Sequence, residues 1–201
     1  MAGDDFTVGP HDMTTQEIRI ADPAMMRALA HPARLAILDY LHDSPSGATA
    51  TECAQISGLS PSATSYHLRT LANLGLVEEA PSRGDGRERV WRAPQHSYRV
   101  DAGQDASPEA LAAERALLDV YLDRENAKVR SWVEHAREEP NEWYDAAVLS
   151  EHRLLVTATE LEEINKTVHD LLDRYRRRER RGAAPEGARA VTVQYRSLPI
   201  D

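Results

Sequence analysis

Apolar and polar positions between residues 60 and 73 follow the period of an amphipathic helix. Ser60 is a good N-cap, and Pro61 suits the first helical position, where its missing N–H costs nothing. Positions spaced i, i+4 and i+7 share one face and can point into a small core. They are Thr64, Leu68 and Leu71. The pattern predicts a short helix with one buried side.

The opposite side of this helix is polar and carries short hydroxyls, one aromatic ring and one guanidinium group. Its members are Ser62, Ser65, Tyr66 and Arg69. No acidic residue occurs between Glu52 and Glu78, so this helix holds no carboxylate that would repel a phosphate. Side chains of these kinds suit the edges of a nucleic-acid groove and its phosphates.

The flanking segments give this helix its context. Upstream, residues 49–58 predict a first helix, with a capping box of Thr49 and Glu52, and with Cys53 and Ile56 facing inward. Gly58 provides a tight turn. Downstream, residues 76–80 and 87–92 predict two strands joined by a turn that contains Asp85-Gly86, a strong hairpin signal. Helix, turn, helix and β-hairpin in this order make a winged helix-turn-helix.

Several motifs occur in order at the spacing of a known family. They are His31-Pro-Ala-Arg-Leu-Ala-Ile-Leu38, Ser65-Tyr-His-Leu-Arg-Thr-Leu71, Gly75-Leu-Val77 and the wing residues Gly84 to Glu88. The run resembles the ArsR-type family of winged helix-turn-helix transcriptional regulators. The resemblance implies a sequence-specific DNA-binding repressor or regulator that acts as a homodimer. A two-fold dimer in turn implies an inverted-repeat operator.

This resemblance places the helix at about 60–73 in the major groove and the wing at about 81–89 on the backbone. The expected DNA contacts are Ser60, Ser62, Ala63, Ser65, Tyr66, Arg69, Arg83, Arg87 and Arg89. For His67, at the edge of the inward face, we expect packing and hydrogen bonding rather than a base contact. The alternatives for the whole surface are a merely solvated helix face, or a winged-helix module that binds proteins and no DNA.

The fold class we predict is mainly α with a small β wing, α+β. Residues 1–15 are expected to be flexible, 16–95 to form the DNA-binding domain, and 106–201 to form a helical dimerisation region that could also sense a ligand. Residues 17–20 predict a short strand, and residues 95–104 an irregular link. The C-terminal region resembles that of an ArsR-like subgroup, in which a long helix precedes a strand, a helix and a last strand. The strands would be 153–156 and 190–195.

A long helix is predicted at about 109–138, with two apolar stripes. Two apolar faces on one helix need two partners, which can be the helix's own domain and a second subunit. The expected dimer contacts are Leu111, Leu118, Leu122, Val129 and Trp132. A small-molecule effector pocket is a further hypothesis, lined by Trp132, His135, Trp143 and Tyr144.

Net charge is −9, which counts against a generic nucleic-acid binder. Much of the acid follows Val100, however, and the reading half is close to neutral, with arginines gathered at the wing. We therefore expect specific binding with modest non-specific affinity and clear salt dependence.

The single cysteine excludes an internal disulfide and favours a reducing cytoplasm. Metal-sensing ArsR relatives carry a Cys-x-Cys pair where this chain has Thr49 and Thr51, so Cys53 is expected in the core and no metal or other cofactor is expected. No membrane-spanning run or signal peptide is apparent, which predicts a cytoplasmic protein without a membrane partner. The sequence shows no nucleophile–base pair, phosphate-binding loop or metal cluster, so we do not expect an enzyme.

Overall fold

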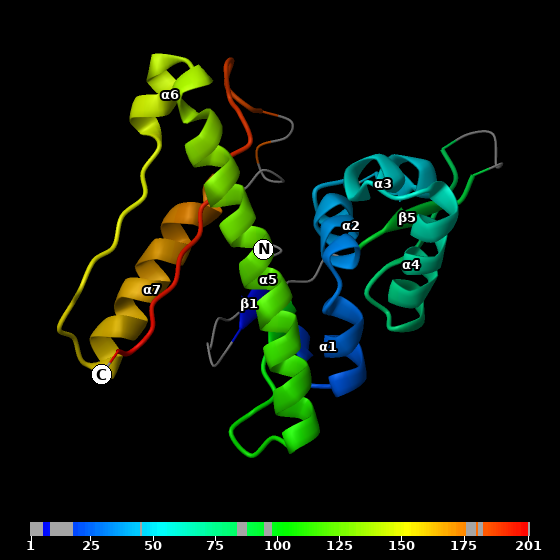
Figure 1. The fold of residues 1–201 in the computed structure, drawn as a ribbon, viewed down its shortest axis with the longest axis horizontal. Helices are drawn as coiled ribbons and strands as arrows, with labels where there is room; N and C mark the ends of the chain where they lie inside the picture. The colour runs from blue at the N-terminus through cyan, green and yellow to red at the C-terminus, as the bar shows by residue number, and fades with distance from the viewer. Residues whose placement is uncertain are drawn as a thin grey trace. The chain divides into compact units, whose positions relative to one another are not determined.

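The computed structural model describes residues 6–8, 18–44, 46–83, 88–94, 98–175, 180 and 183–200. The chain divides into two compact units, Met1–His135 and Ala136–Asp201, and each is described by itself (Figure 1). The long helix was predicted as part of the C-terminal region, whereas in the structure it belongs to the first unit. The boundary between the units therefore lies at 135/136 rather than near residue 106.

Within the residues that the structure describes, the first unit is built on five helices whose first turns are stabilised by local hydrogen bonds. They are α1 (Pro23–Leu29), α2 (Pro32–His42), α3 (Ala50–Ser57), α4 (Pro61–Asn73) and α5 (Pro108–His135). The side chains of Asp22, His31, Thr49 and Ser60 cap the first four helices by accepting a backbone N–H. The capping box of Thr49 and Glu52 is present as predicted. These bonds use donors that have no partner inside the helix, so short local motifs fix where each helix begins.

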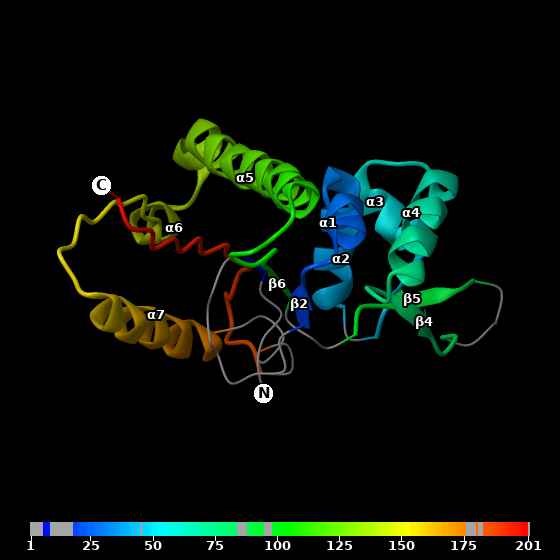
Figure 2. The ribbon, with the colours of Figure 1, turned by 90° about the horizontal axis from the view of Figure 1, so that it is seen from below.

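The wing forms one of the two small sheets found in the described part of the chain. β4 (Glu78–Ala80) pairs antiparallel with β5 (Val90–Arg92), as the hairpin pattern predicted. β5 also pairs with β3 (Ala48–Thr49), which leads into α3. Figure 2 shows these strands beside α4, so the wing and the second helix of the motif lie next to each other.

The second sheet is parallel and was only partly predicted. β6 (Tyr98–Val100) lies between β1 (Phe6–Val8) and β2 (Ile18–Ile20), so the expected irregular link at 95–104 contains a strand. Tyr98 and Val100 are buried with Ile20 in the core. A three-residue strand has too short a pattern to be recognised alone, and its partners lie far away in the sequence.

The core of the first unit joins α1 to α4, both sheets and the start of α5. Its fully buried large side chains include Met26, Leu35, Ile37, Leu41, Leu68, Leu71, Leu76 and Leu117. Ile56, which we expected to face inward, is 53% exposed, and α3 instead buries Cys53 and Ala54. α3 is eight residues long and packs on α2 and α4 with this narrower stripe.

The second unit contains the short helix α6 (Asn141–Ala146) and the amphipathic helix α7 (Ala158–Asp173), after a 3-10 turn at Ala136–Glu138. The predicted strands at 153–156 and 190–195 are wrong, because both segments lie outside any sheet. The C-terminal segment is hydrogen-bonded to α7 instead. Asn165 of α7 accepts hydrogen bonds from Tyr195 (3.0 Å) and Ser197 (2.7 Å). Composition favours strands there, but a strand also needs a neighbouring strand with which to pair.

Across the described segments, no helix combines the length and the hydropathy that crossing a membrane requires.

Candidate nucleic-acid interface

Helix α4 presents two chemically distinct sides, as its sequence pattern predicted. Thr64, Leu68 and Leu71 are fully buried, and the Thr64 hydroxyl donates to the Ser60 carbonyl oxygen (3.0 Å). On the other side Ser62 and Arg69 are exposed, and Tyr66 is 60% exposed. Ser60 is exposed, and Ala63 and Ser65 are half-buried. The predicted contact residues of α4 therefore lie on its accessible surface, while its apolar stripe holds the helix in the core.

Hydrogen bonds within α4 position its polar side chains. Ser65 Oγ donates to the Pro61 carbonyl oxygen (2.8 Å), and Arg69 Nε donates to the Ser65 carbonyl oxygen (3.2 Å). The Arg69 bond uses one of five N–H donors of its guanidinium group. The Ser65 bond uses its only hydroxyl hydrogen, so this side chain faces a ligand mainly as an acceptor.

An open groove lies between α4, the first turn of α3 and the base of the wing. Its volume is about 460 Å³. It is lined by Ala50, Thr51, Pro61, Ser62, Ser65, Arg69, Glu88, Arg89 and Trp91. The structure thus brings together four of the predicted contact residues, Ser62, Ser65, Arg69 and Arg89, from two elements that are separated in sequence. Glu88 was expected beside the wing arginines, but Thr51 and Trp91 could not be predicted as neighbours of this surface, because no local pattern marks them.

The wing is not the basic patch that its arginines suggested. Arg83 Nη1 lies 2.9 Å from Glu52 Oε1, Arg89 Nη1 lies 3.0 Å from Glu79 Oε1, and Arg92 Nη2 lies 2.7 Å from Glu78 Oε1. Residues 78–92 hold four arginines and four acidic residues, so this segment is electrically neutral. The predicted contact Arg87 lies outside the described residues.

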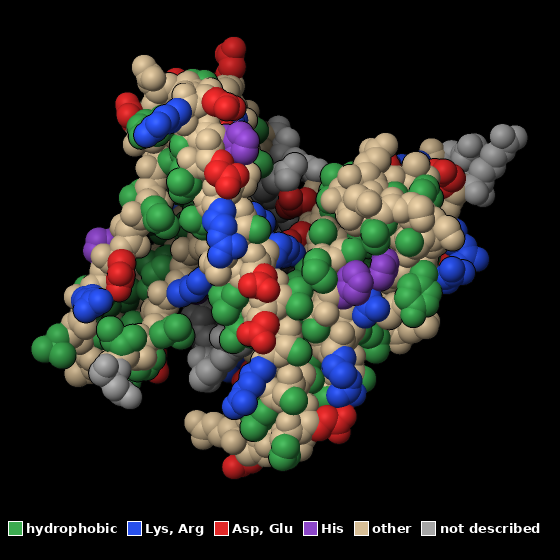
Figure 3. Space-filling view, in the orientation of Figure 1, with side chains coloured by type: hydrophobic (Ala, Val, Ile, Leu, Met, Phe, Trp, Pro, Cys, Tyr) green, Lys and Arg blue, Asp and Glu red, His purple; other side chains and the backbone are tan. Residues whose placement is uncertain are grey.

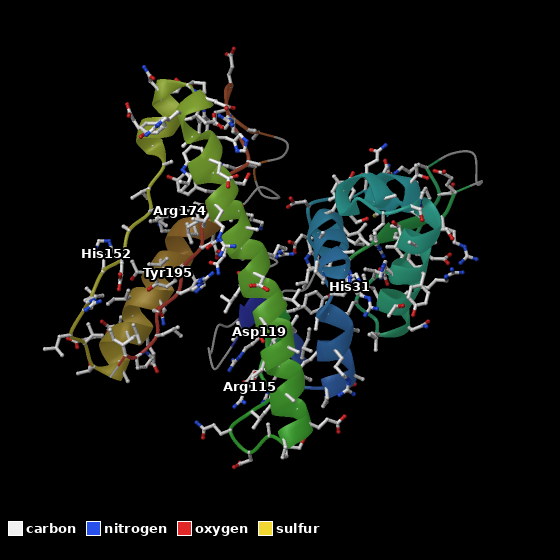
Figure 4. The ribbon with its side chains drawn as sticks, in the orientation of Figure 1. His31, Arg115, Asp119, His152, Arg174 and Tyr195 are labelled. Atoms are coloured by element: carbon white, nitrogen blue, oxygen red, sulfur yellow. The ribbon has the colours of Figure 1, made fainter. Side chains whose placement is uncertain are left out.

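Buried polar groups connect α4 to α2 behind the recognition side. His67 is buried, and its Nδ1 accepts a hydrogen bond from Arg34 Nε (3.3 Å). Arg34 Nη1 also donates to the Ala28 carbonyl oxygen (2.7 Å). His31, labelled in Figure 4 at the start of α2, caps that helix by accepting from the Ala33 N–H (3.2 Å), and its ring centroid lies 4.6 Å from that of His67.

Burial lowers the pKa of both histidines, and the nearby Arg34 charge lowers them further. For His67, the neighbouring His31 also contributes to the lowered pKa. The bonds that His67 and His31 accept at Nδ1 require this nitrogen to be unprotonated, in agreement with the lowered pKa values. The predicted packing and hydrogen-bonding role of His67 is confirmed.

Cys53 lies in the core, as expected. Burial, followed by the Glu52 carboxylate, raises the pKa of its thiol to about 11. A thiol with so high a pKa holds almost no thiolate near neutral pH, and thiolate is the form that binds soft metals. Where residues are described, no group of three or more His, Cys, Asp or Glu side chains is placed to hold a metal ion.

The predicted dimer contacts are all half-buried along α5, whereas Ala110, Ala113 and Leu117 are buried in the first unit's core. Another side of α5 is charged. Figure 3 shows acidic and basic side chains interleaved along it, and Figure 4 labels two of them, Arg115 and Asp119, which are both exposed. The helix therefore has a covered apolar stripe, a partly uncovered apolar stripe and a solvated charged face.

The four residues of the hypothetical effector pocket are divided between the units. Trp132 and His135 are in α5, and His135 Nδ1 lies 2.8 Å from the Ser131 carbonyl oxygen. Trp143 and Tyr144 are in α6. The Trp143 ring carries the Arg189 guanidinium group 4.8 Å from its centroid, and Tyr144 is 50% exposed. An effector pocket at these residues stays a hypothesis.

Comparison with known proteins gives matches in the N-terminal half of the chain. A family model described as "Helix-turn-helix domain" matches residues 29–80, from the end of α1 to the end of β4. The HTH-type transcriptional regulator YgaV of Escherichia coli (strain K12) is 47% identical over 55 residues, which are 27% of this chain and 54% of the relative. The chain thus spans about half the length of this curated relative.

Solved structures give similar matches with low TM-scores. A predicted DNA-binding transcriptional regulator from E. coli is 30% identical, with 49% of this chain and 86% of that chain covered and a TM-score of 0.31. A homodimeric winged helix-turn-helix DNA-binding domain from Mycobacterium bovis, described as a possible ArsR-family regulator, is 27% identical, with 51% and 78% covered and a TM-score of 0.31. A possible transcriptional regulator for arsenical resistance is 30% identical, with 52% and 95% covered and the same TM-score.

The family model and the curated relative agree with the helix-turn-helix that the sequence predicted in the N-terminal half of the chain. Residues 29–80 therefore carry the sequence pattern of a helix-turn-helix domain.

Proposed function

We propose that this protein is a sequence-specific DNA-binding transcriptional regulator, with α4 entering the major groove and the wing contacting the backbone. The observation that carries the proposal is the open groove in which the polar side of α4 meets the base of the wing. A helix seated in the major groove reads base edges through side chains near its N-terminus. Ser62, Ser65 and Arg69 are available for this role. The match to a helix-turn-helix domain supports it.

Each predicted contact has a distinct role in this proposal. Arg69 supplies a donor fork for a guanine edge or a phosphate, and Tyr66 packs its exposed ring against the backbone or a base. The short side chains of α4, Ser60, Ser62, Ala63 and Ser65, allow close approach. Arg83, Arg87 and Arg89 would meet phosphates beside the groove.

The protein would act as a homodimer through the uncovered apolar stripe of α5. Leu118 and Leu122 lie on this stripe, and they remain half-exposed beside the core of their own unit. A second copy of α5 would cover them and remove apolar surface from water. Two-fold symmetry then requires an inverted-repeat operator with half-sites about one helical turn apart. Bound at a promoter, such a dimer would act as a repressor, which a reporter placed downstream of the operator would measure.

The decisive experiment is selection of bound duplexes from a random-sequence pool at near-physiological salt. An enriched inverted repeat supports a dimeric DNA reader and supplies the operator. A folded protein that enriches no sequence contradicts the proposal.

A variant pair then tests the position of the reading surface. Arg69→Ala should lose about 1–3 kcal/mol of operator binding, because a bidentate base contact is worth that much. Arg115→Ala, an exposed arginine of α5, is the matched control and should bind like the parent. Equal binding by both variants would show that α4 does not present Arg69 to the operator.

A second candidate is a winged-helix module that binds a protein and no DNA. The neutral wing favours it, because DNA-binding surfaces usually carry a positive excess. A salt titration of duplex binding separates the two, since phosphate contacts produce a linear fall of log K with log salt.

A further inference from the structure

Three arginine–glutamate pairs surround the base of the wing. Arg83 pairs with Glu52 of α3, and Arg89 and Arg92 pair with Glu79 and Glu78 of β4; these three contacts are called the wing ion pairs below. Their side chains are between 38% and 69% exposed. Each pair thus lies at the surface, at nitrogen–oxygen distances of 2.7 to 3.0 Å.

Exposed ion pairs of this kind stabilise a fold by only about 0–1 kcal/mol. Their stronger effect is on the electrostatic potential outside the protein, because the potentials of opposite charges a few ångströms apart cancel at longer distance. The whole segment 49–92, from the cap of α3 to the end of the wing, holds five arginines and five acidic residues and so has no net charge apart from its histidine. Beyond a Debye length of about 10 Å in 0.1 M salt, this surface attracts phosphate weakly.

We propose that Glu52, Glu78 and Glu79 are specificity-determining residues, which suppress binding to non-operator DNA by neutralising the wing arginines until α4 is seated in its operator. The inference rests on the proposed DNA-binding function. It assigns a role to acidic side chains that would not themselves contact the bases.

Non-specific binding depends on the release of counterions when cationic side chains neutralise phosphates. An arginine that is already neutralised by a glutamate gains little when a phosphate approaches from a distance. The glutamate also repels that phosphate, so loose encounters with random DNA are weakly held.

The operator complex differs because α4, once docked, fixes the backbone within hydrogen-bonding distance of the wing. A phosphate at that distance competes directly with the glutamate for the arginine donors, and charge-assisted bonds of this kind are strong. Breaking a wing ion pair costs only about 0–1 kcal/mol, so a phosphate can replace the glutamate as the partner of the arginine in the specific complex. Specificity would then come from low non-specific affinity as well as from base contacts.

The test is a triple variant, Glu52→Gln, Glu78→Gln and Glu79→Gln, in the full-length protein. Glutamine keeps the shape of each side chain and removes its charge, and glutamine at position 52 also preserves the capping box with Thr49. Binding of a labelled random-sequence duplex and of the selected operator is measured by fluorescence anisotropy between 50 and 200 mM salt.

We expect the salt slope for the random duplex to steepen by about 0.9 for each arginine that reaches a phosphate, or about 2.7 for three. Its affinity should then fall by an additional factor of roughly 40 between 50 and 200 mM salt. Operator affinity should change less, so the ratio of operator to random binding should drop at 50 mM salt.

Glu109→Gln is the matched control, because Glu109 forms a similar exposed pair with Arg27 (2.9 Å) on α1 and α5, away from the wing. It should leave both affinities and both slopes unchanged. The single variant Glu79→Gln, on the exposed face of β4, gives the same comparison with the least change to the fold. Thermal unfolding of each variant verifies that it is folded.

The inference is overturned if the wing variants and the control give the same random-duplex slope, or if the operator-to-random ratio does not fall. A different result tests the proposed function itself. A parent protein that binds neither operator nor random duplex, even at 50 mM salt, would contradict DNA binding altogether.

Discussion

Replacement of Arg34 by alanine should loosen the recognition helix without touching its exposed side. Arg34 donates to the Ala28 carbonyl oxygen at the end of α1 and to His67 on the inner side of α4. The substitution removes both bonds and leaves two part-buried acceptors without this donor. A hydrogen bond from a charged group contributes about 1.5–3 kcal/mol. Because Arg34 is only half-buried and water screens its charge, we discount that range to about 1–1.5 kcal/mol per bond and expect a loss of about 2–3 kcal/mol for the two together.

Amide hydrogen exchange at pH 8, followed by mass spectrometry of peptides, measures this loss where it occurs. A loss of 2–3 kcal/mol corresponds to roughly 30- to 150-fold faster exchange in α4. Peptides from α7, in the other unit, serve as an internal reference and should not change. The pH of 8 keeps His31 and His67 neutral, so that their titration does not contribute.

Arg27→Ala is the control, because Arg27 also joins two helices but through an exposed pair with Glu109. Such a pair contributes about 0–1 kcal/mol, so α4 exchange should be nearly unchanged. If α4 amides exchange at the same rate in Arg34→Ala and Arg27→Ala, the Arg34 hydrogen bonds do not stabilise α4 and the prediction is wrong.

Three further predictions concern the same unit. Burial lowers the pKa of His67 and His31 from 6.5, so below that pH the unfolded state binds more protons than the folded state. The free energy of unfolding should therefore be highest above pH 6.5 and should fall as the pH drops below it, by at most about 1.4 kcal/mol per pH unit for each histidine. Urea denaturation measures this, and a midpoint that does not change between about pH 8 and 5.5 would contradict it. Gly47→Ala should lower the free energy of unfolding by about 1–3 kcal/mol, because φ is +70° and the new Cβ would lie 2.5 Å from a backbone oxygen of β5. Gly58→Ala is the control: it has a similar φ but open space around the new Cβ, so thermal unfolding should show a smaller loss. The Cys53 thiol, with a pKa of about 11, should react with an aromatic disulfide reagent at pH 8 only after denaturation; rapid reaction of the native protein would show that it is accessible.

The helices of the helix-turn-helix motif could be predicted because their determinants are local. The bond from the Ala63 N–H to Ser60, like the capping box of Thr49 and Glu52, joins residues three positions apart. Helical periodicity likewise assigned Leu68 and Leu71 to the buried side. Such signals lie within one or two turns of the chain, so they are legible before the fold is known.

Errors arose where an element needs a partner elsewhere in the chain. β6 is three residues long and becomes a strand by pairing with β1 and β2, while 153–156 and 190–195 have strand composition and lack a strand to pair with. The exposure of Ile56 has a related cause, since its helix is oriented by packing against α2 and α4 rather than by its own sequence.

The sequence by itself determined the order of helices and strands in the motif, the two sides of α4 and the core position of Cys53, because hydrogen-bond caps and helical spacing act over a few residues. Only the tertiary structure decided the electrostatics around the wing. Arg83 and Glu52 are 31 residues apart, and the arginines of the wing appeared basic until folding placed a glutamate beside each described one. Charges separated along the chain cancel only when packing brings them within a few ångströms of each other.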